Sequence, residues 1–216
     1  MNPLFSLPLH GICCVPNCGQ NLESYVKKVH LNFCNINTNI QQNPIWELKD
    51  EGERYLSTVS LFKKTQQQNK NIKPSYLLKI DCQGRGVFEI NENSINIDWK
   101  AEGTDSAHYF QTLGAALYLE INNILCIHAN ALAFKDNAIA IVAPSRTGKT
   151  TLTAALSQNG FALMTDDMMA LHLIENNYVI YPSWPILRMW PDALEEFQKS
   201  ASEDSKKVHQ KFDKRL

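Results

Sequence analysis

The segment from Ser145 to Thr151, with the sequence SRTGKTT, has residue types that bind phosphate in a loop at the start of a helix. Backbone N–H groups of such a loop converge on an anion, and the positive end of the helix dipole favours negative charge. In this pattern Lys149 contacts the β- and γ-phosphates of a nucleotide, and the Thr150 hydroxyl binds Mg²⁺. The predicted nucleotide-binding residues are Ser145, Arg146, Thr147, Gly148, Lys149, Thr150 and Thr151.

The loop departs from the G-x-x-x-x-G-K-[ST] pattern at its first position, where Ala143 replaces glycine. Alanine is the smallest substitute for glycine, so we expect it to be tolerated there. Arg146 stands where many such loops have a small residue, and its side chain could point to solvent or to the phosphates. A chance turn of this composition stays open as an alternative.

Candidate side chains also lie on either side of the loop. Asp166 and Asp167 follow the short apolar run 161–165. Two carboxylates there could hold Mg²⁺, or one could accept the proton of an attacking hydroxyl. The alternative is a turn with a capping aspartate, which the nearby phosphate loop makes less attractive. His128 is the third candidate, although a lone histidine in an apolar strand is usually a core residue with its hydrogen bonds satisfied.

Apolar runs predict the elements that position these residues. Residues 137–143 predict a buried strand that leads into the loop, and residues 149–160 predict a helix that ends at Asn159 and Gly160. Residues 125–134 predict a strand before them. Residues 161–167 predict a short strand, and residues 168–182 predict two strands joined by a turn at Asn176 and Asn177.

The N-terminal half has a different pattern. Residues 76–81, 86–90 and 94–99 are short β-type runs, as in an antiparallel meander. Residues 104–121 predict a core-packing helix with a Thr/Asp cap; its helically spaced apolar residues are Phe110, Leu113, Leu117 and Ile121. Residues 65–73 predict a surface loop. We divide the chain into an N-terminal β-rich region (1–100), a core with the phosphate loop (101–198) and a charged segment (199–216), which we expect to be a solvated helix or loop.

Composition narrows the function classes. The chain has 21 basic and 22 acidic residues, so nothing indicates a nucleic-acid-binding or anionic-membrane surface. No apolar run approaches the roughly 18–20 residues of a membrane span. The N-terminus lacks the basic region and cleavage site of a signal peptide, so we expect a cytoplasmic protein. Most of the six cysteines should then be reduced thiols, and C-C-x3-C is not a usual zinc-ligand spacing.

Residues 127–152 (IHANALAFKDNAIAIVAPSRTGKTTL), followed by residues 161–171 (FALMTDDMMAL), resemble the catalytic core of HPr kinase/phosphorylase. The relatives in this family include kinases that phosphorylate precursor peptides in lasso-peptide gene clusters. The resemblance covers about residues 105–195. It implies that His128, Lys149 and Asp167 are catalytic, with Asp167 accepting the proton of the substrate hydroxyl, and that Thr150 and Asp166 bind Mg²⁺.

The resemblance also implies a fold and an activity. The fold would be α/β, leaning to α+β, with the mixed-sheet P-loop core shared with phosphoenolpyruvate carboxykinase and an N-terminal β-rich lobe. The activity would be ATP- and Mg²⁺-dependent phosphorylation of a serine hydroxyl in a peptide or small protein, such as a lasso-type precursor. Homo-oligomers are common to the family. Two alternatives stay open: a nucleotide- or peptide-binding module without catalysis, and a small-molecule kinase of the same fold.

Residues 181–197 (YPSWPILRMWPDALEEF) resemble a segment of the peptide-kinase branch more than one of true HPr kinases. HPr kinases carry a Mg²⁺-binding glutamate before an arginine; Arg188 is present here, but that glutamate is not, and Asp192 could replace it. Arg188 could contact phosphate or peptide, or stack on Trp184 or Trp190. Family members continue past the end of this chain, so we expect the core to be incomplete.

Overall fold

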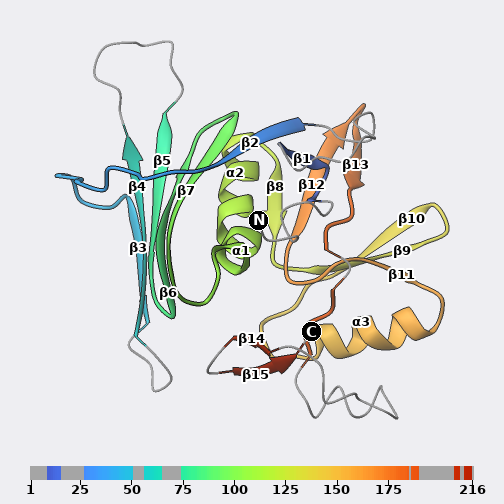
Figure 1. Ribbon diagram of the computed structural model, residues 1–216. Coiled ribbons are helices and arrows are strands. Elements are labelled where there is room, and N and C mark those ends of the chain that lie inside the picture. Colours follow the sequence, from blue (N-terminus) through green and yellow to red (C-terminus); the bar gives the residue numbers. More distant parts are fainter. Residues whose placement is uncertain are drawn as a thin grey trace. The chain divides into compact units, whose positions relative to one another are not determined.

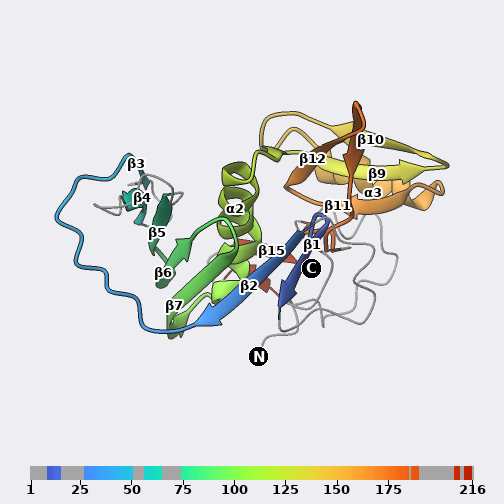
Figure 2. The ribbon, with the colours of Figure 1, turned by 90° about the horizontal axis from the view of Figure 1, so that it is seen from above.

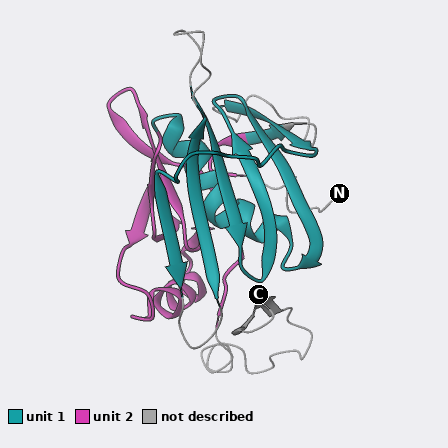
Figure 3. Ribbon diagram, turned by 90° about the vertical axis from the view of Figure 1, so that its left-hand side faces the viewer, with its two compact units in different colours: residues 1–6, 13–123 teal, residues 7–12, 124–216 magenta. Residues whose placement is uncertain are grey.

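The computed structural model describes residues 9–15, 27–50, 56–64, 74–184 and 186–189, and the backbone of residues 207–209 and 212–215. The chain forms two compact units (Figure 3). Unit 1 contains Met1–Ser6 and Cys13–Asn123, and unit 2 contains Leu7–Ile12 and Ile124–Leu216. The units therefore divide the chain between Asn123 and Ile124, whereas the sequence suggested a division at 100/101. The helix predicted over residues 104–121 belongs to unit 1.

Unit 1 is built on a mixed sheet of seven strands in the order β1-β2-β7-β6-β5-β4-β3 (Figure 1). The strands are β1 (Ile12–Val15), β2 (Lys27–Phe33), β3 (Trp46–Asp50), β4 (Ser57–Lys64), β5 (Ser75–Asp81), β6 (Gly84–Ile90) and β7 (Ser94–Gly103). Strands β3 to β7 pair antiparallel in sequence order, while β2 lies parallel to β7. The antiparallel meander predicted over residues 76–99 is confirmed.

The predicted helix forms, but in three parts: α1 (Ser106–Tyr109), a π-helical turn η3 (Phe110–Gly114) and α2 (Ala115–Ile121). Asp105 caps the start by accepting a hydrogen bond from the Ala107 N–H at 3.0 Å. The π-turn adds a residue to one turn and rotates the helix that follows. As a result, Tyr118 and Leu119 are buried, whereas the predicted Leu113 and Leu117 are only partly buried.

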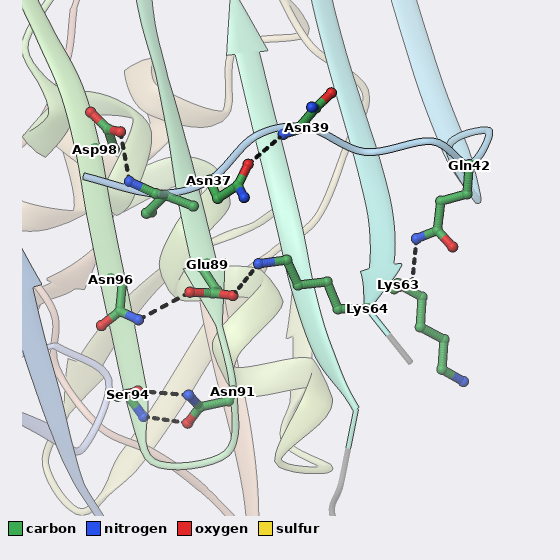
Figure 4. A network of polar contacts seen from close by, with 11 residues as sticks. Asn37, Asn39, Gln42, Lys63, Lys64, Glu89, Asn91, Ser94, Asn96 and Asp98 are labelled. Atoms are coloured by element: carbon green, nitrogen blue, oxygen red, sulfur yellow. Dashed lines mark hydrogen bonds and ion pairs between the residues drawn. The ribbon is translucent and has the colours of Figure 1, made fainter. Parts of the chain in front are cut away.

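One face of the sheet in unit 1 carries a polar network (Figure 4). A small apolar cluster lies near it. Glu89 accepts hydrogen bonds from Lys64 at 2.6 Å and from Asn96 at 3.2 Å. Burial raises the pKa of Glu89, but these hydrogen bonds outweigh burial and the pKa lies below its usual value. The segment after β2 crosses this face, with Ile36 packed against Leu77.

Unit 2 contains two antiparallel three-stranded sheets, in the orders β10-β9-β11 and β13-β12-β8 (Figure 1). Its elements are β8 (Leu125–Ile127), β9 (Asn130–Phe134), β10 (Asn137–Ile141), α3 (Lys149–Gln158), β11 (Ala162–Thr165), β12 (Met169–Ile174) and β13 (Asn177–Ile180). Helix α3 packs against β9 and β11 (Figure 2). The chain as a whole is mixed α/β and rich in strands, as expected.

Three expectations for unit 2 need correction. The strand predicted over residues 125–134 breaks at His128 and Ala129 into β8 and β9, which belong to different sheets. The strand predicted as buried, β10, is an exposed edge strand, because among the described strands it pairs with β9 alone. Within the charged segment at 199–216, where a helix or loop was expected, the described residues form a strand pair, β14 (Lys207–His209) and β15 (Phe212–Arg215). The surface loop predicted at 65–73 lies outside the described residues.

The hairpin of β12 and β13 is confirmed, with its turn shifted by one residue. The turn residues are Glu175 and Asn176, which both have left-handed backbone angles (φ 47° and 65°). Two successive positive φ angles are typical of the two-residue turns that match the twist of a hairpin. None of the helices in the described part of the chain is long and apolar enough to cross a membrane.

The cysteines differ in state. Cys13 is disulfide-bonded, whereas Cys14, Cys34, Cys82 and Cys126 are free thiols. Burial raises the pKa of the Cys14 thiol to about 12, so this thiol stays protonated.

Two buried histidines connect the segment around His10 to the rest of unit 2. The His10 N–H donates to the Pro182 carbonyl at 3.2 Å, and His172 Nε2 donates to the His10 carbonyl at 2.8 Å. Burial, with a smaller contribution from the charge of His172, lowers the pKa of His10 from 6.5 to about 3. Burial also lowers the pKa of His172, although its hydrogen bond to His10 raises it. Both rings are therefore neutral in the folded protein at pH 7.

We expect the free energy of unfolding to fall as the pH drops below 6.5, because the unfolded chain protonates His10 there while the folded chain does not until about pH 3. The slope from this residue is at most about 1.4 kcal/mol per pH unit. Between pH 7 and pH 5, the free energy of unfolding should fall by about 1–2 kcal/mol less in His10→Asn than in the wild type. Urea unfolding at the two pH values measures this difference. The control His30→Asn replaces an exposed histidine and should keep the wild-type dependence. Equal pH dependence in His10→Asn and wild type would contradict the prediction.

Candidate functional site

The strand order of unit 2 brings three of the predicted segments to one edge of one sheet. Strand β9 lies between β10 and β11 and is antiparallel to both. Strands β10 and β11 therefore run in the same direction and end where β9 begins. The phosphate loop follows β10, the Asp166–Asp167 pair follows β11, and His128 precedes β9. Residues far apart in the sequence thus meet at this edge (Figure 1).

The loop before α3 passes twice through left-handed backbone conformations. Arg146 has φ 65° and Gly148 has φ 94°. A side chain makes this region unfavourable, which explains why many such loops have a small residue where Arg146 stands. Ala143 is not among the residues with positive φ, so the backbone there does not need glycine. The departure at Ala143 is thus compatible with the shape of the loop.

Lys149 is the first residue of α3, and its side chain folds back over the loop. Its Nζ donates to the Ala143 carbonyl at 2.8 Å and to the Pro144 carbonyl at 3.2 Å. The Thr147 hydroxyl also donates to the Pro144 carbonyl, at 2.7 Å. Lys149 is buried, with 8% of its surface exposed. The ammonium group is therefore held at the loop by neutral acceptors, which an anionic ligand could replace.

The other loop residues are accessible. Ser145, Arg146, Thr147 and Gly148 are exposed, while Thr150 and Thr151 are partly buried in the first turn of α3. The N-cap residue of this helix is Gly148, which has no side chain to cap the first turn. The loop and the first turn of α3 thus present the features that bind phosphate elsewhere: backbone donors, a helix N-terminus and a lysine.

The two aspartates lie in a tight turn after β11. Asp167 has φ 69°, a left-handed conformation that aspartate tolerates better than most residues. The Met168 N–H donates to the Asp166 carbonyl, and the Thr165 hydroxyl donates to the Met168 carbonyl at 2.6 Å. These bonds fix the direction in which both carboxylates leave the backbone.

Arg188 binds both aspartates. Its backbone N–H donates to Asp166 Oδ2 at 2.9 Å, and its guanidinium Nη1 forms an ion pair with Asp167 Oδ2 at 3.0 Å. The two paired side chains are 11% and 26% exposed, so water screens the pair only in part. Arg188 thus contacts two carboxylates, which were not among the partners considered for it from the sequence. Trp184 packs edge-on against the ring of His10, and Trp190 and Asp192 lie outside the described residues.

His128 lies in the bend between β8 and β9 and is exposed. The interpretation as a core histidine is therefore wrong. The reason is that the apolar run 125–134 does not form one strand but changes sheet at this residue. The His128 imidazole, two residues before β9, is therefore accessible from solvent.

Sequence reasoning missed two residues of this site, Asn130 and Thr153. Asn130 Nδ2 donates to the Thr153 hydroxyl at 2.9 Å, and Asn130 Oδ1 accepts a hydrogen bond from the Asp167 N–H at 3.2 Å. Both side chains are fully buried. The available signal was Asn130 itself, a polar residue inside the apolar run 129–134. A buried amide needs hydrogen-bond partners, so its position indicates polar neighbours.

The oxygen atoms at this edge are of the chemical kind that Mg²⁺ prefers. Among the residues that the structure describes, no group of three or more His, Cys, Asp or Glu side chains is arranged to bind a metal. Mg²⁺ in phosphate-transfer sites usually needs only one or two carboxylates, with phosphate oxygens and waters completing its shell. The Asp166 carboxylate and the Thr150 hydroxyl are hard oxygen ligands of this kind.

Replacing Arg146 with glycine should stabilise unit 2. Arg146 is exposed and has a left-handed φ, which costs a residue with a side chain about 1–2 kcal/mol. Glycine removes this cost but loses more chain entropy, so we expect Arg146→Gly to raise the free energy of unfolding by about 0.5–1 kcal/mol. The matched control Ser145→Gly has no left-handed angle to relieve and should not be stabilised. A lower urea midpoint for Arg146→Gly than for the wild type would disagree with this account.

Comparisons with known proteins identify no family for this chain. No protein-family model matches the chain, and neither the search of curated proteins nor the search of solved structures found a match. The interpretation of the site therefore depends on its own residues and on the way β9, β10 and β11 arrange them.

Proposed function

We propose that this chain is an ATP- and Mg²⁺-dependent phosphotransferase, an HPr-kinase-like serine kinase that phosphorylates a hydroxyl of a peptide or small protein. The observation that carries the proposal is the meeting of three segments at one sheet edge. These segments hold the phosphate loop after β10, the aspartates after β11 and His128 before β9. Phosphoryl transfer depends mainly on positioning and on neutralising charge, and these are the residue types that it needs.

The nucleotide would bind at the loop. Its phosphates would accept hydrogen bonds from backbone N–H groups before α3 and would replace the carbonyls of Ala143 and Pro144 as partners of Lys149. Mg²⁺, held by Thr150 and Asp166 together with phosphate oxygens, would neutralise charge on the transferred group. Arg146 is close enough in sequence to add a further positive charge at the mouth of the loop.

The transfer itself would use Asp167. The hydroxyl oxygen of the acceptor attacks the γ-phosphorus, the bond between this phosphorus and the β,γ-bridging oxygen breaks, and ADP leaves. The hydroxyl proton passes to the Asp167 carboxylate. Asp167 must first exchange its ion pair with Arg188 for the hydroxyl, which leaves the guanidinium free to bind a phosphate oxygen.

The antiparallel arrangement supports the type of core that we propose. In the usual P-loop sheet the strands near the loop are parallel, whereas β10 and β11 are both antiparallel to the strand between them. We propose the mixed-sheet core of HPr kinase and phosphoenolpyruvate carboxykinase from the resemblance of residues 127–152 and 161–171, and the antiparallel pairing distinguishes this sheet from the usual parallel one. On the same resemblance we propose a peptide acceptor, such as a lasso-type precursor. A cytoplasmic location stays part of the proposal.

A second candidate function, a nucleotide-binding module without catalysis, is favoured by one observation. The carboxylate proposed as the base already forms an ion pair with Arg188. A base that keeps this partner could not accept a proton efficiently. Binding of Mg²⁺-ATP without transfer to water or to any serine peptide would favour this second function.

The first prediction of the kinase proposal concerns binding. Lys149→Met keeps most of the buried side-chain stem but removes the charge, and it should weaken Mg²⁺-ATP binding about tenfold or more, or roughly 1.4 kcal/mol. Isothermal titration calorimetry measures this directly, and we expect micromolar binding for the wild type. Lys135→Asn, in the exposed turn between β9 and β10, is the matched control and should bind as the wild type does. No binding of ATP, GTP or pyrophosphate by the wild type would refute the proposal.

The second prediction concerns the chemical step. Asp167→Asn can still bind Arg188 but cannot accept a proton, so it should bind Mg²⁺-ATP within about threefold of the wild type and lose transfer by about a hundredfold or more. Transfer is measured as ³²P incorporation into a serine peptide library and as ADP release with water as the acceptor. Asp136→Asn, in the exposed turn before β10, controls for the loss of a carboxylate. Undiminished transfer by Asp167→Asn would exclude Asp167 as the base.

A further inference from the structure

A continuous chain of hydrogen bonds connects the first turn of α3 to the turn that holds Asp167. The Thr153 hydroxyl donates to the Lys149 carbonyl at 2.9 Å, and Asn130 Nδ2 donates to the Thr153 oxygen at 2.9 Å. Asn130 Oδ1 then accepts a hydrogen bond from the Asp167 N–H at 3.2 Å. Asn130 and Thr153 have no exposed surface, so water does not compete for these bonds.

The chemistry of the groups fixes the direction of each bond. The Lys149 carbonyl can only accept, so the single hydroxyl hydrogen of Thr153 is used there. The Thr153 oxygen must then accept from Asn130, which places the NH₂ group of Asn130 toward α3. The Asp167 N–H can only donate, so it faces the Asn130 oxygen. Asn130 therefore has one orientation that satisfies both neighbours.

We propose that Asn130 is a positioning residue that couples the phosphate-loop helix to the conformation of the Asp167 turn. If Thr153 loses its hydroxyl, the NH₂ group of Asn130 lacks a buried acceptor, and the side chain must shift or rotate. Asp167 then loses the acceptor of its N–H while it still has to keep a left-handed φ. A change at α3 is thus transmitted to Asp167, although Thr153 and Asp167 share no hydrogen bond.

The hydrogen bond between Asn130 and Asp167 is separate from the contact that Arg188 makes with Asp167. Arg188 Nη1 binds the Asp167 carboxylate, whereas Asn130 binds the Asp167 backbone. The Arg188 ion pair affects which groups the Asp167 carboxylate can contact. The Asn130 hydrogen bond affects the position of the Asp167 backbone. The structural coupling does not depend on catalysis. Its importance for phosphoryl transfer rests on the proposed function, in which loop and base must act on one ligand.

Amide hydrogen exchange in the ligand-free protein tests the coupling. Thr153→Val removes the hydroxyl with little change of shape and should speed exchange of the Asp167 amide about fivefold or more. Amides in the β12–β13 hairpin of the same unit should change less than about twofold. Thr153→Ser keeps a hydroxyl and should restore the wild-type rate at Asp167. NMR or fragment-resolved mass spectrometry gives these rates.

A double-mutant comparison shows whether Asn130 is the connecting residue. In Asn130→Ser, whose shorter side chain cannot reach both partners, adding Thr153→Val should change Asp167 exchange less than about twofold. A full fivefold effect in that background would overturn the proposal, because the coupling would then bypass Asn130. Equal acceleration at Asp167 and in the β12–β13 hairpin would also overturn it, since Thr153 would then only stabilise unit 2. If Asn130→Ser does not fold, the Thr153 variants still decide the question.

Exchange measurements with Mg²⁺-ATP distinguish a failure of this inference from a failure of the kinase proposal. If Mg²⁺-ATP binds, it should slow Asp167 exchange in the wild type, and the slowing should be lost in Thr153→Val but kept in Thr153→Ser. Bound nucleotide that leaves Asp167 exchange unchanged would contradict the coupling. If no nucleotide binds, the kinase proposal fails, and exchange in the ligand-free variants still tests the role of Asn130.

Discussion

The pairing of β9 with both β10 and β11 is the constraint on which the candidate site depends. Because β9 is antiparallel to both neighbours, the loops that leave β10 and β11 come out at the edge where β9 starts. No side chain of the site needs to be long to span the three segments. Asn130, the first residue of β9, hydrogen-bonds through its side-chain amide to Thr153 in α3 and to Asp167 after β11. The sheet thus brings the three segments to one edge, and the buried amide of Asn130 connects α3 to the Asp167 turn.

The charged groups of the site are held in partly buried positions by partners that a ligand could replace. Lys149 bonds to two loop carbonyls, and Asp167 bonds to Arg188. A buried charge without such partners would be costly, so these contacts keep the ligand-free site stable. They also mean that binding exchanges one set of partners for another, so only a ligand with strong acceptors, such as phosphate, can compete for the lysine.

The backbone of the site is strained in a way that the rest of unit 2 supports. Arg146 and Asp167 both adopt left-handed angles that are unusual for residues with side chains. Such conformations persist where surrounding bonds hold them, and they are frequent at functional sites. At Asp167 the holding bonds come from Asn130 and from the turn closed by Thr165. In the turn at Glu175–Asn176, the same angles close the hairpin of β12 and β13.

The sequence by itself determined the local features of this protein: the loop before α3, the β12–β13 hairpin, the meander of β5 to β7 and the capped helix after it. These follow from neighbouring residues, whose turn chemistry and periodicity act over short distances. Only the tertiary structure decided that β10 is an edge strand, that the run around His128 divides between two sheets, and that a π-turn rotates the buried face of α2. It also decided the partners of Asn130 and Arg188, which lie on distant segments. The physical reason is that strand order and buried hydrogen bonds depend on which segments pair, and residue types alone do not specify this.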